Sequence, residues 1–168
     1  MAVVVMSLTG LMVAGPASAA TPPPPPSAAA LTEWWNTGRG DYYAAGTYDG
    51  NVSAIQYGYT QVRIEAYVLS SQVTGSVPLY LFWNAARQDN FTTATSAGIN
   101  SAFQHFYGQI RVEGYVYTTQ VTGTVPLYTY WNPNYGDNAS AASAATISTL
   151  VSSGYTLVRI EGYVYPAV

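Results

Sequence analysis

Apolar and polar positions alternate along three stretches of the chain. These stretches are residues 62–68, 110–116 and 158–165. A period of two is typical of a β-strand, because successive side chains point to opposite faces of the sheet. One face of the first stretch carries Val62 and Ile64, and the other carries Arg63 and Glu65. We expect the apolar face to pack against a helix, since both surfaces then leave water.

The segments before these strands have the spacing of a helix instead. The middle segment has apolar residues at i, i+3, i+4 and i+7, namely Ile99, Ala102, Phe103 and Phe106. A second stripe comprises Ile147, Leu150 and Val151. Gly154 follows it at the position where a helix commonly ends with a left-handed residue. The corresponding first segment is weaker, because Gly50 interrupts it.

Two shorter strands precede each helical segment. Leu79–Asn84 is rich in strand-forming residues and follows Pro78, which a strand tolerates at its start. Residues 84–89 are a polar turn, and 91–95 form a second short strand. The predicted unit is therefore β-β-α-β.

This unit recurs three times at a spacing of 48 residues, without insertion or deletion. The recurring columns are Trp35, Trp83 and Trp131; Asn36, Asn84 and Asn132; Asp41, Asp89 and Asp137; Arg63, Arg111 and Arg159; and Glu65, Glu113 and Glu161. We place repeats at 29–76, 77–124 and 125–168. One repeat is too small to bury both its helix and its strands. We therefore expect a single α+β, mostly β domain (29–168) with pseudo-threefold symmetry; a β-trefoil is the alternative, which the helical stripe disfavours.

The N-terminal segment reads as an export signal. Val3–Val13 is a short apolar run, and Ala17-Ser18-Ala19 resembles a cleavage site. We expect a signal peptide at 1–20, a proline-rich linker at 21–28, and a secreted protein without membrane attachment after cleavage. The apolar run is shorter than the roughly 20 residues of a membrane span.

Composition excludes several functions. Only 8% of residues are charged, the formal net charge is −3, and there are no cysteines and one histidine. Such a chain offers no basic stripe for nucleic acid. It also lacks thiolate chemistry and the usual zinc ligands, so we expect no metal and no cofactor. The aromatic residues, 14% of the chain, remain the distinctive feature.

The repeats resemble a known family. The third reads Val125-Pro126-Leu127-Tyr128-Thr129-Tyr130-Trp131-Asn132-Pro133, then Gly136-Asp137, Gly154-Tyr155 and Glu161-Gly162-Tyr163-Val164. This is similar to a secreted bacterial and fungal repeat family of uncharacterised function, whose copies contain P-L-Y, N-P, D-H-F-Y-T, G-W and E-G elements. The resemblance implies export and a role at cell walls or carbohydrate. The family histidine is absent here: Asp41 precedes Tyr42, and Asp89 and Asp137 precede asparagine.

Two sets of recurring residues are candidates for function. Tryptophan faces stack on sugar rings, and asparagine and aspartate bond hydroxyl groups. The candidate ligand-binding residues are therefore Trp35, Asn36, Asp41, Trp83, Asn84, Asp89, Trp131, Asn132 and Asp137. The alternative is that the indoles form core and that the polar residues cap their own turns. The second set, Arg63, Glu65, Arg111, Glu113, Arg159 and Glu161, is expected to form structural ion pairs between repeats.

No catalytic motif recurs with the repeats. His105 is matched by Tyr57 and Ser153, and no nucleophile elbow is present. We therefore expect a secreted, non-catalytic module that binds polysaccharide or cell-surface glycan at up to three weak, equivalent sites. A structural or protein-interaction domain is the alternative, and a glycoside hydrolase using a pair such as Asp89 and Glu113 is a distant one.

Overall fold

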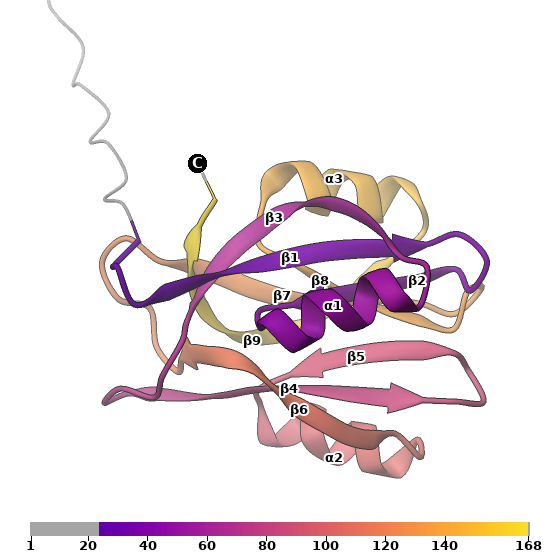
Figure 1. The fold of residues 1–168 in the computed structure, drawn as a ribbon, viewed down its shortest axis with the longest axis horizontal. Helices are drawn as coiled ribbons and strands as arrows, with labels where there is room; N and C mark the ends of the chain where they lie inside the picture. The colour runs from indigo at the N-terminus through magenta and orange to yellow at the C-terminus, as the bar shows by residue number, and fades with distance from the viewer. Residues whose placement is uncertain (1–23, 168) are drawn as a thin grey trace, which may run out of the picture.

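Nine strands and three helices make up residues 24–167, the part of the chain that this computed structural model describes (Figure 1). The first unit contains β1 (Ala28–Asn36), β2 (Asp41–Ala45), α1 (Tyr48–Gln56) and β3 (Thr60–Leu69). The second contains β4 (Ser76–Asn84), β5 (Asp89–Thr93), α2 (Ser96–Gln104) and β6 (Gly108–Tyr117). The third contains β7 (Val125–Asn132), β8 (Asp137–Ala141), α3 (Ala144–Ser152) and β9 (Thr156–Pro166). The expected signal peptide and residues 21–23 of the expected linker lie outside the described residues.

The protein is mostly β, and its nine strands form one antiparallel sheet. In each unit the first strand lies between the other two, so that β1 pairs with both β2 and β3. The same arrangement holds for β4 with β5 and β6, and for β7 with β8 and β9. The ends of β3, β6 and β9 pair with one another and so join the three units. Figure 1 shows the three helices apart from each other. Each helix contacts the short strand of its own unit.

The core has one shared part and three peripheral parts. Leucines from the first strands and valines from the third strands of all three units meet in the shared part: Leu31, Leu79, Leu127, Val68, Val116 and Val164. Each helix buries one small or apolar side chain against its neighbouring hairpin. In the second unit Ala102 packs with Phe82, Phe91 and Tyr107. Because the shared part draws on every unit, the units support one another.

A β-bulge in the third strand of each unit makes different side chains face the core from those expected from the sequence. Leu31 pairs with Ala66 but Thr32 pairs with Ile64, which leaves Glu65 as the extra residue. Such a bulge re-aims the side chains on either side of it. Glu65 is consequently buried and Ile64 is exposed. The expectation that Val62 and Ile64 pack against a helix was wrong, and the same register shift occurs at β6 and β9.

The three helices have similar N-caps, and the predicted end of the third helix is confirmed. Each N-cap hydroxyl, at Thr47, Thr95 and Ser143, accepts a hydrogen bond from a backbone N–H of the first turn. Gly154 follows α3 with φ of +86°, as predicted for a helix end. Phe106 takes the same position after α2 with φ of +63°, and its ring is 90% exposed. It therefore belongs to the turn, and the predicted apolar stripe ends before it.

Candidate functional site

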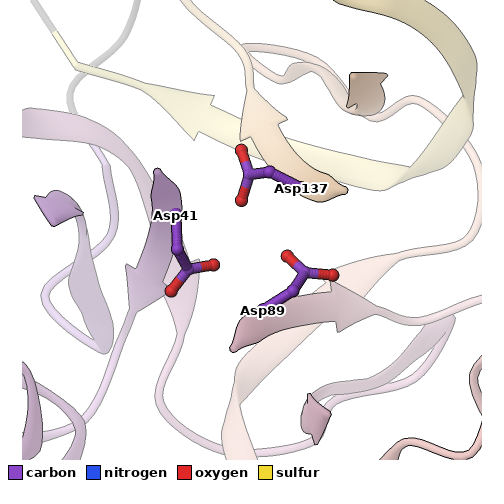
Figure 2. A group of neighbouring side chains, drawn as sticks. All are labelled: Asp41, Asp89 and Asp137. Atoms are coloured by element: carbon purple, nitrogen blue, oxygen red, sulfur yellow. The ribbon is translucent and has the colours of Figure 1, made fainter. Parts of the chain in front are cut away.

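Three aspartates converge where the short strands begin. Asp41, Asp89 and Asp137 are the first residues of β2, β5 and β8, and their side chains point toward one another (Figure 2). One oxygen from each carboxylate lies within 4.8 Å of the other two. Each aspartate is only 1% exposed. The recurrence of aspartate in the sequence thus reflects a single buried cluster.

Hydrogen bonds from neighbouring units close this cluster into a ring. Each Oδ1 accepts from the backbone N–H of the residue after another aspartate. The pairs are Asp41 with Asn90 at 2.9 Å, Asp89 with Asn138 at 2.9 Å, and Asp137 with Tyr42 at 3.0 Å. Each Oδ2 accepts from a tyrosine hydroxyl of its own unit, contributed by Tyr59, Tyr107 and Tyr155 respectively. Both oxygens of every carboxylate therefore have partners within the protein.

Burial determines the protonation of this cluster. Burial, and then the charge of Asp41, raise the pKa of Asp89 to about 7. Burial also raises the pKa of Asp41. The pKa of Asp137 is raised well above its usual value, first by burial and then by the charges of Asp89 and Asp41. Burial and the nearby carboxylates raise the pKa values of the three tyrosine partners too, so their hydroxyls remain donors.

The cluster has the donor chemistry that a hard cation prefers, since carboxylate oxygens suit calcium and magnesium. The oxygens of all three carboxylates, however, already accept hydrogen bonds from protein groups. The sequence grouped these aspartates with the tryptophans as ligand-binding residues. The structure instead places them inside the protein, where they join the units.

The asparagines are also occupied within the protein. The amide nitrogens of Asn36, Asn84 and Asn132 donate to the carbonyl oxygens of Tyr57, His105 and Ser153, at the ends of the helices. Their side-chain oxygens accept from backbone N–H groups of the following turn. Each asparagine thus ties a hairpin turn to a helix end. These contacts are the ones that the turn-capping alternative describes.

The tryptophans of the recurring column are half-buried, and two of them line pockets. The first pocket, of about 230 Å³, lies between the first and second units. Its walls include Trp83, Tyr57, Tyr59, Asn90, Arg39 and Arg111. The second, of about 260 Å³, lies between the second and third units. Its walls include Trp131, His105, Tyr107, Asn138, Arg87 and Arg159. Each of these wall positions in the first pocket corresponds to the position 48 residues later in the second pocket.

One arginine in each pocket, Arg39 in the first and Arg87 in the second, lies over aromatic rings. The Arg39 guanidinium carbon is 5.2 Å from the centre of the Trp83 ring and 5.5 Å from that of Tyr59. Arg87 lies 5.4 Å from the ring centre of Trp131 and 5.8 Å from that of Tyr107. Such cation–π contacts hold the guanidinium group at the pocket wall.

The corresponding place between the third and first units is filled by aromatic rings. Tyr135 stands where the other units have Arg39 and Arg87, and Tyr42 stands where they have asparagine. Trp35 lies 4.5 Å from Tyr42 and 6.3 Å from Tyr135, measured between ring centres. The three tryptophans of the column are therefore not equivalent.

The glutamates of the arginine–glutamate set bind the helix N-termini of neighbouring units. Glu113 accepts from Gly46 and Thr47 before α1, Glu161 from Ala94 and Thr95 before α2, and Glu65 from Ala142 and Ser143 before α3. A carboxylate is favourable there because the helix N-terminus carries partial positive charge.

The ion pairs of this set lie within strands. Arg111 pairs with Glu113 at 3.2 Å, and Arg159 with Glu161 at 3.1 Å. Among residues 24–167, no carboxylate lies within 4.0 Å of Arg63, and its Nε is buried without a hydrogen-bond partner. Between units, the glutamates of this set bind the helix N-termini, and Arg111 donates to the Tyr43 hydroxyl. The oxygens of the three aspartates accept from tyrosine and backbone donors rather than from these arginines.

Sequence reasoning missed the pocket residues Arg39, Arg87, Asn90 and Asn138. Arg39 and Arg87 are 48 residues apart, as are Asn90 and Asn138, but the remaining unit has a tyrosine at each of these positions. They therefore do not belong to the columns that all three units share. Tyr59, Tyr107 and Tyr155 recur in all three units and were a signal for the aspartate partners.

No helix among residues 24–167 has the length and apolar character needed to cross a membrane.

Comparisons with known proteins place the chain in a family. Searches of curated proteins and of solved structures found no match. A family model described as "Domain of unknown function (DUF5648)" matches residues 23–165, which is most of the chain. The chain belongs to the DUF5648 family.

Proposed function

We propose that this protein is an exported, non-catalytic module that binds carbohydrate in the pockets beside Trp83 and Trp131. The observation that carries this proposal is the make-up of the two pockets. Each combines half-exposed aromatic rings with a few polar groups in a concave surface between units. Binding sites for small molecules generally have this composition.

The proposal includes an assembly of three β-β-α-β repeats about a pseudo-threefold axis. The order of elements, the joined ends of β3, β6 and β9, and the ring of aspartate contacts support it. In such an assembly every pocket lies between two repeats. Pockets related by the axis present the same chemistry to a repeating polymer, and two linked weak sites increase the overall affinity.

Polar groups in the pockets suit sugar hydroxyls. The Asn90 amide nitrogen donates to Asp41 and Tyr59, so its carbonyl oxygen has no protein donor among the described residues. Tyr57, at the pocket wall, is 61% exposed. A sugar ring stacked on an aromatic face would thus have a hydrogen-bond acceptor beside it.

A non-catalytic role is supported by the position of the carboxylates. Glycoside hydrolases generally use two carboxyl groups that flank the scissile bond. Here Asp89 and Glu113 are both 1% exposed and are bonded to protein groups. Neither lines a pocket. The acidic pair considered from the sequence is therefore out of reach of a substrate in those pockets.

The test is retention of residues 20–168 on insoluble polysaccharides and purified cell walls, followed by tryptophan fluorescence during titration with soluble oligosaccharide. We expect retention that soluble sugar reverses. Trp83→Ala with Trp131→Ala should abolish retention, whereas Trp35→Ala, in the ring-filled place, should not. Absence of retention on every matrix would contradict the proposal and favour a structural or protein-interaction domain.

A further inference from the structure

The ionisable side chains that this protein exposes to solvent are mostly basic, although its formal net charge is negative. The chain has eight acidic residues and five arginines, which gives a net charge of −3. Seven of the eight acidic residues are buried, and Asp49 is the exposed one. None of the five arginines is buried. An approaching ligand therefore meets mainly positive groups.

Two of these positive groups, Arg39 and Arg87, lie at the pockets. Within residues 24–167, no carboxylate lies within 4.0 Å of Arg39 or Arg87. A guanidinium has five N–H donors. Arg39 uses one toward Tyr59 at 3.2 Å, and Arg87 uses one toward Tyr107 at 3.4 Å. Most donors of both side chains thus have no protein acceptor.

Each pocket also has a second arginine on its wall. Arg111 and Arg159 contact Glu113 and Glu161 through Nη1 only. In the first pocket Arg111 also donates to Tyr43 at 2.7 Å. These bonds fix the guanidinium groups without using their remaining donors. Each pocket therefore presents two positioned guanidinium groups next to aromatic rings.

We propose that the two pockets bind the carboxylate-bearing sugar units of an acidic polysaccharide, a polymer of uronic acid. This inference rests on the proposed function and names the class of carbohydrate. The forked donors of arginine match a carboxylate in two parallel hydrogen bonds, and these are among the strongest polar contacts in proteins. Tryptophan and tyrosine faces supply the surface for the sugar ring.

Pocket size and number make the inference specific. Volumes of about 230 and 260 Å³ fall below the roughly 300–1,000 Å³ typical of drug-sized ligands, so each pocket suits a single ring. The place between the third and first units has Tyr135 and Tyr42 instead of arginine and asparagine. We therefore expect two acidic-sugar sites in each chain.

The experiment compares two acidic polymers, polygalacturonate and alginate, with their methyl esters, which keep the sugar backbone and lose the charge. We expect the protein to bind at least one acidic polymer and to lose roughly tenfold or more in affinity for its ester, since charge-assisted hydrogen bonds are lost. Binding should weaken when salt is raised from about 0.05 to 0.5 M. Titration with short acidic oligosaccharides should give two sites.

The variant pair Arg39→Gln with Arg87→Gln should lose most of this affinity. Its control is Ser71→Asp with Thr119→Asp, which changes the net charge by the same amount at exposed positions outside both pockets.

Equal binding of acid and ester, or unchanged binding of the arginine variant, would overturn the inference while leaving carbohydrate binding intact. Binding of single-stranded DNA as tight as that of the acidic polymer would also overturn it. No binding to any polysaccharide would remove the proposed function as well. The ester comparison needs no variant and holds even if the arginine pair fails to fold.

Discussion

Glu113 and Thr47 lie 66 residues apart in the chain, yet the Glu113 carboxylate accepts hydrogen bonds from both the backbone N–H and the hydroxyl of Thr47, at 3.1 and 2.7 Å. Thr47 is also the N-cap of α1 and accepts a hydrogen bond from Gly50. One buried carboxylate therefore stabilises a helix start in the first unit and an ion pair with Arg111 in the second.

Glu113→Gln should lower the free energy of unfolding by about 2 kcal/mol, because the buried side chain loses its charge-assisted hydrogen bonds with Gly46 and Thr47. The amide also provides one acceptor oxygen where the carboxylate provides two. Urea unfolding followed by circular dichroism measures the change. A loss below about 1 kcal/mol would show that this carboxylate is not an important link between the units.

Glu33→Gln is the opposite case and should stabilise the protein at alkaline pH. Burial, and then the nearby Glu65, raise the pKa of Glu33 to about 8, and its Oε1 is buried without a hydrogen-bond partner. Above pH 8 the wild type must keep this charge buried, whereas the amide has none. Thermal unfolding at pH 9 should give a higher Tm for the variant. A lower Tm at pH 9 would contradict this reasoning.

Stability should fall as pH rises from about 4 to 8. A carboxyl whose folded pKa lies above its unfolded value binds its proton more tightly when folded, so its contribution is lost as pH rises through the folded pKa. Asp89, with a pKa of about 7, faces Asp41 and Asp137, whose pKa values are also raised. Each such proton accounts for roughly 1.4 kcal/mol per pH unit.

Unfolding in urea at intervals across this range tests the prediction, with Asp89→Asn as the comparison. The variant should show a shallower decline, because one titrating group has been removed. A wild type that gains stability from pH 4 to 8 would contradict the assignment of raised pKa values.

Gly98→Ala should destabilise the protein, although alanine favours a helix by about 1 kcal/mol over glycine. A Cβ at this position would lie 1.8 Å from Oγ1 of Thr93 and 2.9 Å from Nη1 of Arg159. Asn100→Ala, at an exposed position of the same helix, is the control and should be neutral or slightly stabilising. A Tm for Gly98→Ala at or above that of the wild type would show that this contact relaxes without cost.

The order of elements was predictable because it depends on local periodicity. The positions of the helix caps and of Gly154 follow from short-range rules of backbone conformation. The bulge at Glu65 was not predictable, because the alternation around it favours burial of Val62 and Ile64 rather than of Glu65. The pairing of β3 with β1 determines which side chains of β3 are buried. The local sequence pattern of β3 carries no information about that pairing.

The residues of the expected site lie apart for a related reason. Trp83 and Asn84 are consecutive residues of one strand, so their side chains point to opposite faces. A tryptophan, its neighbouring asparagine and the following aspartate therefore do not meet in one groove. The pockets form instead between units, where Trp83 of β4 meets Tyr57 and Arg39 of the first unit. Such a combination requires knowledge of how the units are placed.

The closure between the first and last units bears on how the chain reaches its folded state. Tyr42 and Asp137, 95 residues apart, are joined by a hydrogen bond, and Ala66 of β3 pairs with Pro166 of β9. Contacts between residues so distant in sequence slow folding, because the loop entropy is lost before the contact forms. The first unit therefore lacks its partners from the third unit until the last strand has been synthesised. We expect a slow-folding chain whose N-terminal third stays open to proteolysis whenever β9 is missing.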